Sequence, residues 1–200
     1  LLKLLAGFLP PSSGHILFKG NRVVSPGPER CVVFQEDALF PWLTVQEHIG
    51  FGLKKGKMTR DEMQKPVDRF LNLTGLVRFR DYLPQDISGG MKQRVALARV
   101  LVLNPEVLLM DEPFAALDAQ TRERMQDLLL SLWQELGQTI VFVTHDVTEA
   151  VTLSDRTMVM DMVPGNFTDI VAIDLERPRG QENKDFIAVT GYLRSLVAAS

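Results

Sequence analysis

A short apolar run at residues 107–110 is followed directly by two carboxylates, Asp111 and Glu112. A continuous apolar segment of this kind is typical of a strand buried on both faces of a parallel sheet, and ligands of α/β proteins usually bind at the carboxyl edge of that sheet. Side chains alternate along a strand, so the two acids cannot both point at the same atom, and we expect them to have different roles. Taken alone, an ordinary core strand that runs into a charged turn would be the better interpretation.

The composition limits the class of protein. The 200 residues, with 46% hydrophobic content, suffice for one α/β domain with a sizeable core. A net charge of -3 and the interleaving of basic with acidic residues argue against a nucleic acid as a direct partner. Cys31 is the only cysteine, so an intramolecular disulfide is impossible, which fits the cytoplasm. The apolar stretch at 95–103 contains Arg99 and is far shorter than the roughly 20 residues of a membrane span, so a membrane connection requires a partner.

Hydrophobic periodicity divides the chain into helices and strands. Helical patterns cover residues 1–8, 44–82, 88–103, 119–136 and 185–199. Strand patterns cover residues 15–19, 31–34, 107–110, 139–143, 157–161 and 167–175. We expect one α/β domain over residues 1–200, with a mostly parallel sheet and a helical subdomain at about 39–103 inserted within it.

A Ser-Gly-Gly sequence at residues 88–90 precedes a helical pattern. The first turn of a helix leaves backbone N–H groups unpaired, and two glycines let a phosphate approach them closely. Ser88, Gly89 and Gly90 are therefore candidate phosphate ligands. The same sequence is also a common transition from loop to helix, so other motifs must decide between the two interpretations.

Such motifs occur in a fixed order. The strand at 31–34 ends at Gln35, residues 87–91 are Ile-Ser-Gly-Gly-Met, the acids at 111–112 are followed by Pro113 and by Leu-Asp at 117–118, and the strand at 139–143 is followed by Thr-His-Asp. Together they resemble the Q-loop, signature, Walker B, D-loop and switch-histidine motifs of ATP-binding-cassette (ABC) ATPases. The resemblance extends from Leu1 to about Arg179 and implies a P-loop NTPase-type α/β fold. Positions 87, 91 and 115 depart from the residues most common in the family.

The resemblance implies a role for each residue around the γ-phosphate. Asp111 holds Mg²⁺ through water, and Glu112 is the general base or orients the attacking water. His145 contacts the γ-phosphate, and Gln35 touches Mg²⁺ and the water. Without the resemblance, Glu112 would be a surface acid, His145 a packed or solvated histidine, and Gln35 a turn residue.

Two further sites belong to the contact between paired subunits. By resemblance, Ser88, Gly89 and Gly90 bind the phosphates of the ATP that is held by a second subunit. Asp118 lies in the D-loop, which crosses the dimer interface in the family. Asp118 also has the position of a cap for the helix that starts at Ala119, and the two roles are compatible.

The 200 residues contain no Gly-x-x-x-x-Gly-Lys-Ser/Thr sequence, the P-loop that cradles nucleotide phosphates. Residues 52–58 resemble it, but the spacing between their glycines is one residue too short and they end in Met. In the family, the sequence at residues 1–7 would follow the P-loop directly. We therefore expect that the chain begins just after the P-loop, and that it is inactive as an ATPase in this form.

Residues 33–45 and 113–122 look most like importers of nitrate, taurine, alkanesulfonate and bicarbonate. The resemblance implies two ATP-binding subunits, a homodimer, that sandwich two Mg-ATP. The pair is bound to two transmembrane permease subunits at the cytoplasmic face of the membrane, and a periplasmic solute-binding protein delivers the solute. The alternatives are a non-catalytic fragment that completes a partner's ATP site and a soluble ABC ATPase that does not transport. The identity of the solute depends on the partner subunits.

An apolar cluster, Phe40, Trp42 and Leu43, follows the Gln35 segment. We expect it to dock onto a membrane subunit, because a loop that touches both γ-phosphate and a partner can transmit the nucleotide state as displacement. Packing of Trp42 into the core is an equally good interpretation of the sequence. His15 and His48 lie in no such motif, and we assign them no functional role.

Overall fold

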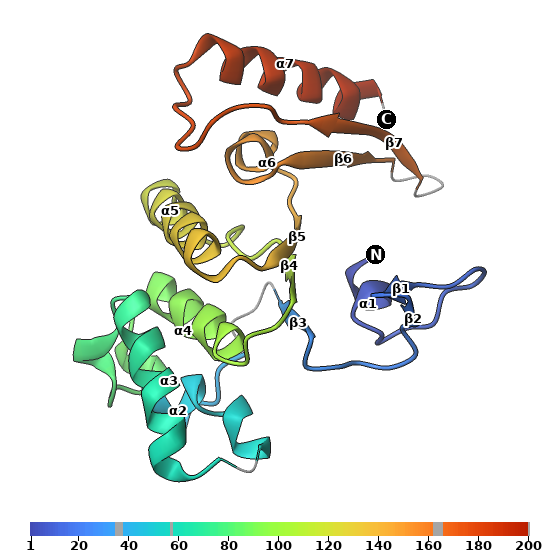
Figure 1. The fold of residues 1–200 in the computed structure, drawn as a ribbon. Coiled ribbons are helices and arrows are strands. Elements are labelled where there is room, and N and C mark those ends of the chain that lie inside the picture. Colours follow the sequence, from blue (N-terminus) through green and yellow to red (C-terminus); the bar gives the residue numbers. More distant parts are fainter. Residues whose placement is uncertain (35–37, 57, 162–165, 200) are drawn as a thin grey trace. The chain divides into compact units, whose positions relative to one another are not determined.

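The computed structural model describes residues 1–34, 38–56, 58–161 and 166–199 (Figure 1). The chain divides into two compact units, Leu1–Val143 and Thr144–Ser200, which are described separately below. Within the described ranges, no helix is both long enough and apolar enough to cross a membrane.

The first unit is built on a parallel sheet of three strands in the order β3-β4-β5 (Figure 1). The strands are β3 (Arg30–Val33), β4 (Val107–Asp111) and β5 (Thr139–Val143). The register pairs Val33 with Met110 on one side of β4 and Asp111 with Val143 on the other. The predicted parallel sheet and α/β class are confirmed, and the strand expected at 107–110 continues through Asp111.

Both faces of β4 are covered. On one face, Leu109 packs with Leu2 and Ala6 at the short helix α1 (Leu2–Leu5). Side chains alternate along a strand, so Leu108 and Met110 face the opposite side, and both are fully buried. The long helices α4 (Gly89–Leu101) and α5 (Ala119–Leu136) pack against each other, and α4 also packs against β3.

The predicted helical stretch at 44–82 consists of separate pieces. They are α2 (Val45–Ile49), the 3₁₀ turn Gly52–Lys55, α3 (Arg60–Leu73) and the 3₁₀ turn Val77–Phe79. Thr44 and Thr59 each begin a helix with a reciprocal capping box, to Glu47 and Glu62. Glycines between the two helices favour the break. A third 3₁₀ turn, Pro84–Asp86, precedes α4, and β1 (Leu17–Phe18) and β2 (Asn21–Arg22) form an antiparallel hairpin near the amino terminus.

The second unit packs two helices on an antiparallel pair of strands. Its elements are α6 (Val147–Leu153), β6 (Arg156–Met160), β7 (Phe167–Ala172) and α7 (Lys184–Ala199). Its core consists of buried apolar side chains from α6, β6 and α7 and from the segment after β7. They are Val151, Val159, Ile173, Phe186 and Leu193.

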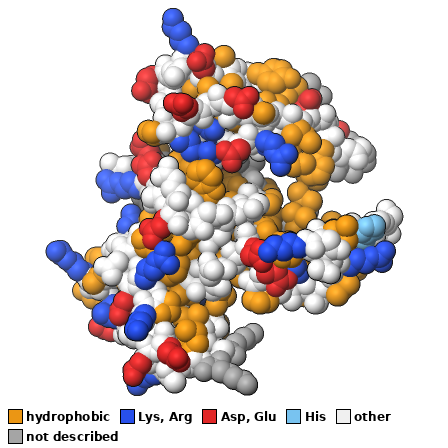
Figure 2. Space-filling model, in the orientation of Figure 1, with side chains coloured by type: hydrophobic (Ala, Val, Ile, Leu, Met, Phe, Trp, Pro, Cys, Tyr) orange, Lys and Arg blue, Asp and Glu red, His pale blue; other side chains and the backbone are white. Residues whose placement is uncertain are grey.

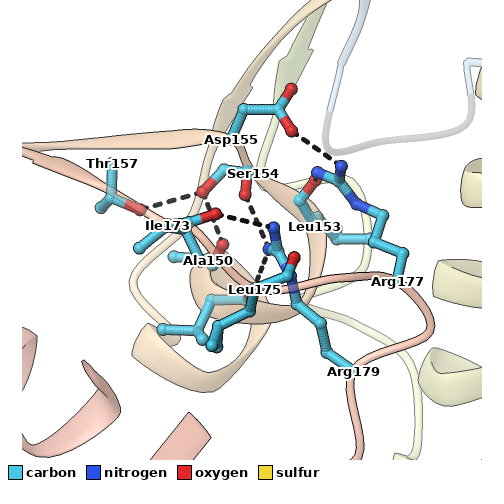
Figure 3. A network of polar contacts seen from close by, with 10 residues as sticks. Ala150, Leu153, Ser154, Asp155, Thr157, Ile173, Leu175, Arg177 and Arg179 are labelled. Atoms are coloured by element: carbon cyan, nitrogen blue, oxygen red, sulfur yellow. Dashed lines mark hydrogen bonds and ion pairs between the residues drawn. The ribbon is translucent and has the colours of Figure 1, made fainter. Parts of the chain in front are cut away.

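Arg179 binds four backbone carbonyls of the second unit at once (Figure 3). Its guanidinium donates to Val151 and Ser154 at the end of α6, and to Ile173 and Leu175 after β7. The last carbonyls of a helix have no partner within the helix, so this side chain supplies their donors. Burial, and secondarily Arg177, lower the pKa of Arg179 from its usual range. Arg179 thus joins α6 to the segment that follows the sheet.

We predict that Arg179→Met lowers the free energy of unfolding by about 2–3 kcal/mol, because four partly buried carbonyls lose a charged donor. Urea denaturation followed by circular dichroism measures the change. Arg156→Met removes an exposed arginine of β6 and is the matched control, for which we expect a change within about 0.5 kcal/mol. Equal stability of the two variants would contradict the anchoring role of Arg179.

Candidate functional site

The amino-terminal end of α4 is open to solvent. Ser88 caps the helix, and its hydroxyl accepts from the Met91 N–H at 3.4 Å. Ser88 and Gly89 are exposed, and a Cβ built on Gly89 meets no atom of the described residues within 4 Å. Packing within the chain therefore gives no reason for a glycine at position 89. The predicted approach of a phosphate would give one, because the free N–H groups of a helix start attract anions.

Gly90 has a different reason to be glycine. A Cβ at this position would lie 2.6 Å from the Thr121 Cγ2 of α5, so Gly90 allows the start of α4 to contact the first turn of α5. In that turn the Thr121 N–H donates to Asp118 Oδ1 at 3.0 Å, and Asp118 caps α5 as predicted. Hydrogen bonds from Thr121 lower the pKa of the exposed Asp118 carboxyl. The signature segment and the D-loop segment thus lie side by side.

Asp111 and Glu112 differ in backbone geometry. Asp111 is the last residue of β4. Glu112 has φ +43°, a left-handed conformation that costs a non-glycine residue roughly 1–2 kcal/mol. Its N–H donates to the Val143 carbonyl at 3.0 Å, and its own carbonyl accepts from Ala115 at 3.2 Å. A tight turn, rather than strand alternation, therefore sets the direction of the Glu112 side chain.

The structure collects several predicted site residues in the first unit. Ser88, Gly89 and Gly90 start α4, Asp111 and Glu112 end β4, and Asp118 starts α5. His145 is an exposed residue of the second unit and directly precedes Asp146, which caps α6. Gln35 lies outside the described residues.

A cation at Asp111 would have few protein ligands. Among the residues described, no group of three or more His, Cys, Asp or Glu side chains is placed to hold a metal ion. Mg²⁺ commonly binds one or two carboxylates and completes its shell with water and substrate phosphates. The half-buried Asp111, at the end of a central strand, fits that mode of binding.

The segment after residues 35–37 is fixed by a buried histidine, which sequence reasoning missed. His48 Nε2 accepts from the Phe40 N–H at 2.8 Å, and its Nδ1 lies 2.9 Å from the Thr44 carbonyl. The imidazole is therefore neutral, with its proton on Nδ1, and burial lowers the pKa of His48. Arg99 of α4 also donates to the Ala38 carbonyl at 2.8 Å. One sequence signal could have indicated this role. His48 stands four residues after Thr44, which caps the helix, so its ring can reach the Thr44 carbonyl.

The aromatic residues of this segment lie largely at the surface. Trp42 is 71% exposed, which excludes its packing into the core. The half-buried Phe40 contacts Trp42 at 5.6 Å between ring centroids and Phe51 at 5.0 Å. Together, Phe40, Trp42 and Phe51 form an aromatic patch directly after the predicted Q-loop.

Comparison with known proteins decides the family. The sequence pattern that defines the ABC transporter family matches residues 1–115. The chain belongs to the ABC transporter ATP-binding family. It is 45% identical to the nitrate import ATP-binding protein NrtD of Synechocystis, over 92% of this chain and 71% of NrtD. It is 50% identical to the taurine import ATP-binding protein TauB of Pelagibacter ubique, over 82% of this chain and 62% of TauB.

Solved structures agree with this assignment. The ABC protein's fold matches that of cbiO1 from Clostridium perfringens, which is part of the cbiONQ transporter complex. The TM-score is 0.80 and the identity 32%, over 97% of this chain and 76% of cbiO1. It also matches a dimeric ATP-binding cassette bound to ADP and Pi, with a TM-score of 0.72 and 30% identity. The match covers 90% of this chain and 79% of that cassette. The predicted P-loop NTPase-type fold is therefore confirmed, and the protein is an ABC-type ATPase subunit.

We predict that the two adjacent glycines respond differently to alanine. Gly89→Ala leaves the free energy of unfolding unchanged or raises it by up to about 1 kcal/mol, because alanine favours helix and has free space there. The same change lowers ATP turnover if a phosphate approaches that backbone. Gly90→Ala lowers stability by about 1–3 kcal/mol through the contact with Thr121. Chemical denaturation of both variants measures the difference, and equal effects would contradict this assignment.

Proposed function

We propose that this ABC ATPase drives the import of a small anion such as nitrate, taurine, alkanesulfonate or bicarbonate. The proposal is supported by its identity to the nitrate and taurine import proteins, 45% and 50% over most of this chain. The observation that carries it is the aromatic patch that follows the predicted Q-loop in the sequence, because an exposed apolar patch with a 71%-exposed Trp42 is typical of a surface that binds a protein partner.

The ATP-site residues have complementary tasks in hydrolysis. The N–H groups at Ser88–Gly90 bind phosphate oxygens of an ATP held by a second copy, and Asp118 lies at the contact between copies. Asp111 would hold Mg²⁺ through water, and this cation neutralises phosphate charge when bound. Gln35 and His145 take the family's roles beside the metal and the γ-phosphate.

Glu112 orients the attacking water. As the water oxygen bonds to the γ-phosphorus, the bond from that phosphorus to the β-γ bridging oxygen breaks, and ADP leaves. The proton of the water passes to the Glu112 carboxylate or to the phosphate product. The left-handed turn at Glu112, which is stabilised by neighbouring contacts, supports a role in which the direction of this carboxylate matters.

The proposed assembly is a homodimer at the cytoplasmic face of the membrane. Two transmembrane permease subunits bind the aromatic patch, and a periplasmic solute-binding protein delivers the anion to them. A dimer is supported by the ADP-bound cassette of similar fold. Basic and acidic side chains are interspersed on the face in Figure 2, which supports a protein partner rather than a nucleic acid.

We predict that Glu112→Gln in the full-length protein lowers kcat for ATP hydrolysis about a hundredfold or more and leaves ATP binding intact, because the amide keeps the shape and loses the basic oxygen. Steady-state turnover and equilibrium nucleotide binding measure the two effects. Glu123→Gln, an exposed acid of α5, is the matched control. Turnover of Glu112→Gln at the wild-type rate would reduce Glu112 to a surface acid.

We predict that Trp42→Ala weakens binding to the permease subunits by about 2 kcal/mol or more, since exposed tryptophans are frequent interface hot spots. Basal ATPase activity and stability remain, because Trp42 is mostly exposed. Co-purification with the permease and solute uptake are measured beside Tyr192→Ala, which removes an aromatic residue that is 52% exposed on α7. Unchanged assembly and uptake would refute the docking role.

A further inference from the structure

A buried glutamine joins the helix that starts at the signature segment to the residue after Glu112. Gln93 is 5% exposed, and its Nε2 donates to the Pro113 carbonyl at 2.8 Å. Gln93 lies four residues after Gly89, about one helical turn, so both belong to the start of α4. The hydrogen bond crosses from α4 to the turn that begins at Glu112.

This turn has an unfavourable local conformation. Glu112 is in the left-handed region, and it precedes Pro113, a position where extended backbone is preferred. Such a conformation persists only when the surrounding structure enforces it. The contacts of Glu112 itself and those of the adjacent residues therefore hold this turn together, and with it the direction of the Glu112 side chain.

Other contacts fix the same segment farther along the chain. Arg122 of α5 donates to the carbonyls of Phe114 at 3.3 Å and Leu117 at 2.8 Å. The ring of Phe114 is 2% exposed and lies 5.7 Å from that of Phe142. These contacts stabilise residues 114–117, whereas Gln93 holds the carbonyl of Pro113, the residue directly after Glu112.

We propose that Gln93 is a positioning residue for hydrolysis. It orients the Glu112 carboxylate through the Pro113 carbonyl, and it makes that orientation depend on the position of the start of α4. The inference rests on the proposed role of Glu112. Binding of phosphate at Gly89 and aiming of Glu112 are then linked through one turn of helix and one hydrogen bond.

The test is Gln93→Met in the full-length protein, since methionine fills a similar volume and cannot donate to Pro113. We expect kcat to fall about tenfold or more, with KM for ATP changed less than about twofold. In a Glu112→Gln background, Gln93→Met should cause no further loss. Gln138→Met is the matched control: Gln138 is 7% exposed in the same unit, and its amide nitrogen has no hydrogen-bond partner in the described part of the chain, so kcat should stay at the wild-type value.

Gln93→Glu, which introduces a side chain of similar shape, supplies a second readout. A protonated carboxyl can donate to Pro113 and an ionised one cannot, and burial raises the pKa of an introduced carboxyl. The ratio of variant to wild-type kcat should therefore rise as the pH falls.

The outcomes separate this inference from the function it rests on. Wild-type kcat in Gln93→Met, with Glu112→Gln inactive, overturns the positioning role alone. Wild-type kcat in Glu112→Gln overturns the proposed role of Glu112 and the inference with it. Parallel losses in thermal stability and ATP affinity, or a flat ratio in Gln93→Glu, overturn positioning in favour of a purely structural role.

Discussion

Burial of β4 on both faces is the constraint on which the rest of the first unit depends. Leu108, Leu109 and Met110 can be covered on both sides only if helices lie on each face of a parallel sheet. The strand must then end at the sheet edge, where Asp111 and Glu112 follow without a spacer. The apolar residues thus determine where the two carboxylates emerge, and α4 and α5 add their own starts to the same unit.

Much of this arrangement could be predicted from local sequence patterns. The strand at 107–110 was recognisable from its length and apolar character, and the cap at Asp118 from its position before a helical pattern. The helical spacing over 44–82 indicated the helical insert but not where its helices break, because hydrophobic spacing continues across helix breaks. The capping boxes at Thr44 and Thr59 carried the boundary information, as each is followed three residues later by glutamate.

What the sequence could not reveal is mostly contact between a side chain and a distant backbone carbonyl. Gln93 bonds to Pro113, and Arg179 to Val151 and Ser154, across separations that no local pattern encodes. His48 looked unremarkable because it lies outside every motif, yet both of its ring nitrogens have backbone partners. The exposure of Trp42 likewise depended on which side of the segment faces solvent, and that required the three-dimensional packing.

The contrast between Gly89 and Gly90 has a consequence for protein engineering. A procedure that optimised only the stability of the isolated fold would keep Gly90, because a larger residue there would clash with Thr121. The same procedure would replace Gly89 with a better helix former. If phosphate binds at Gly89 as proposed, the resulting protein would be more stable and less able to accept that ligand. Under this proposal, a locally suboptimal residue with free space around it marks a position where requirements from outside the chain outweigh those of folding.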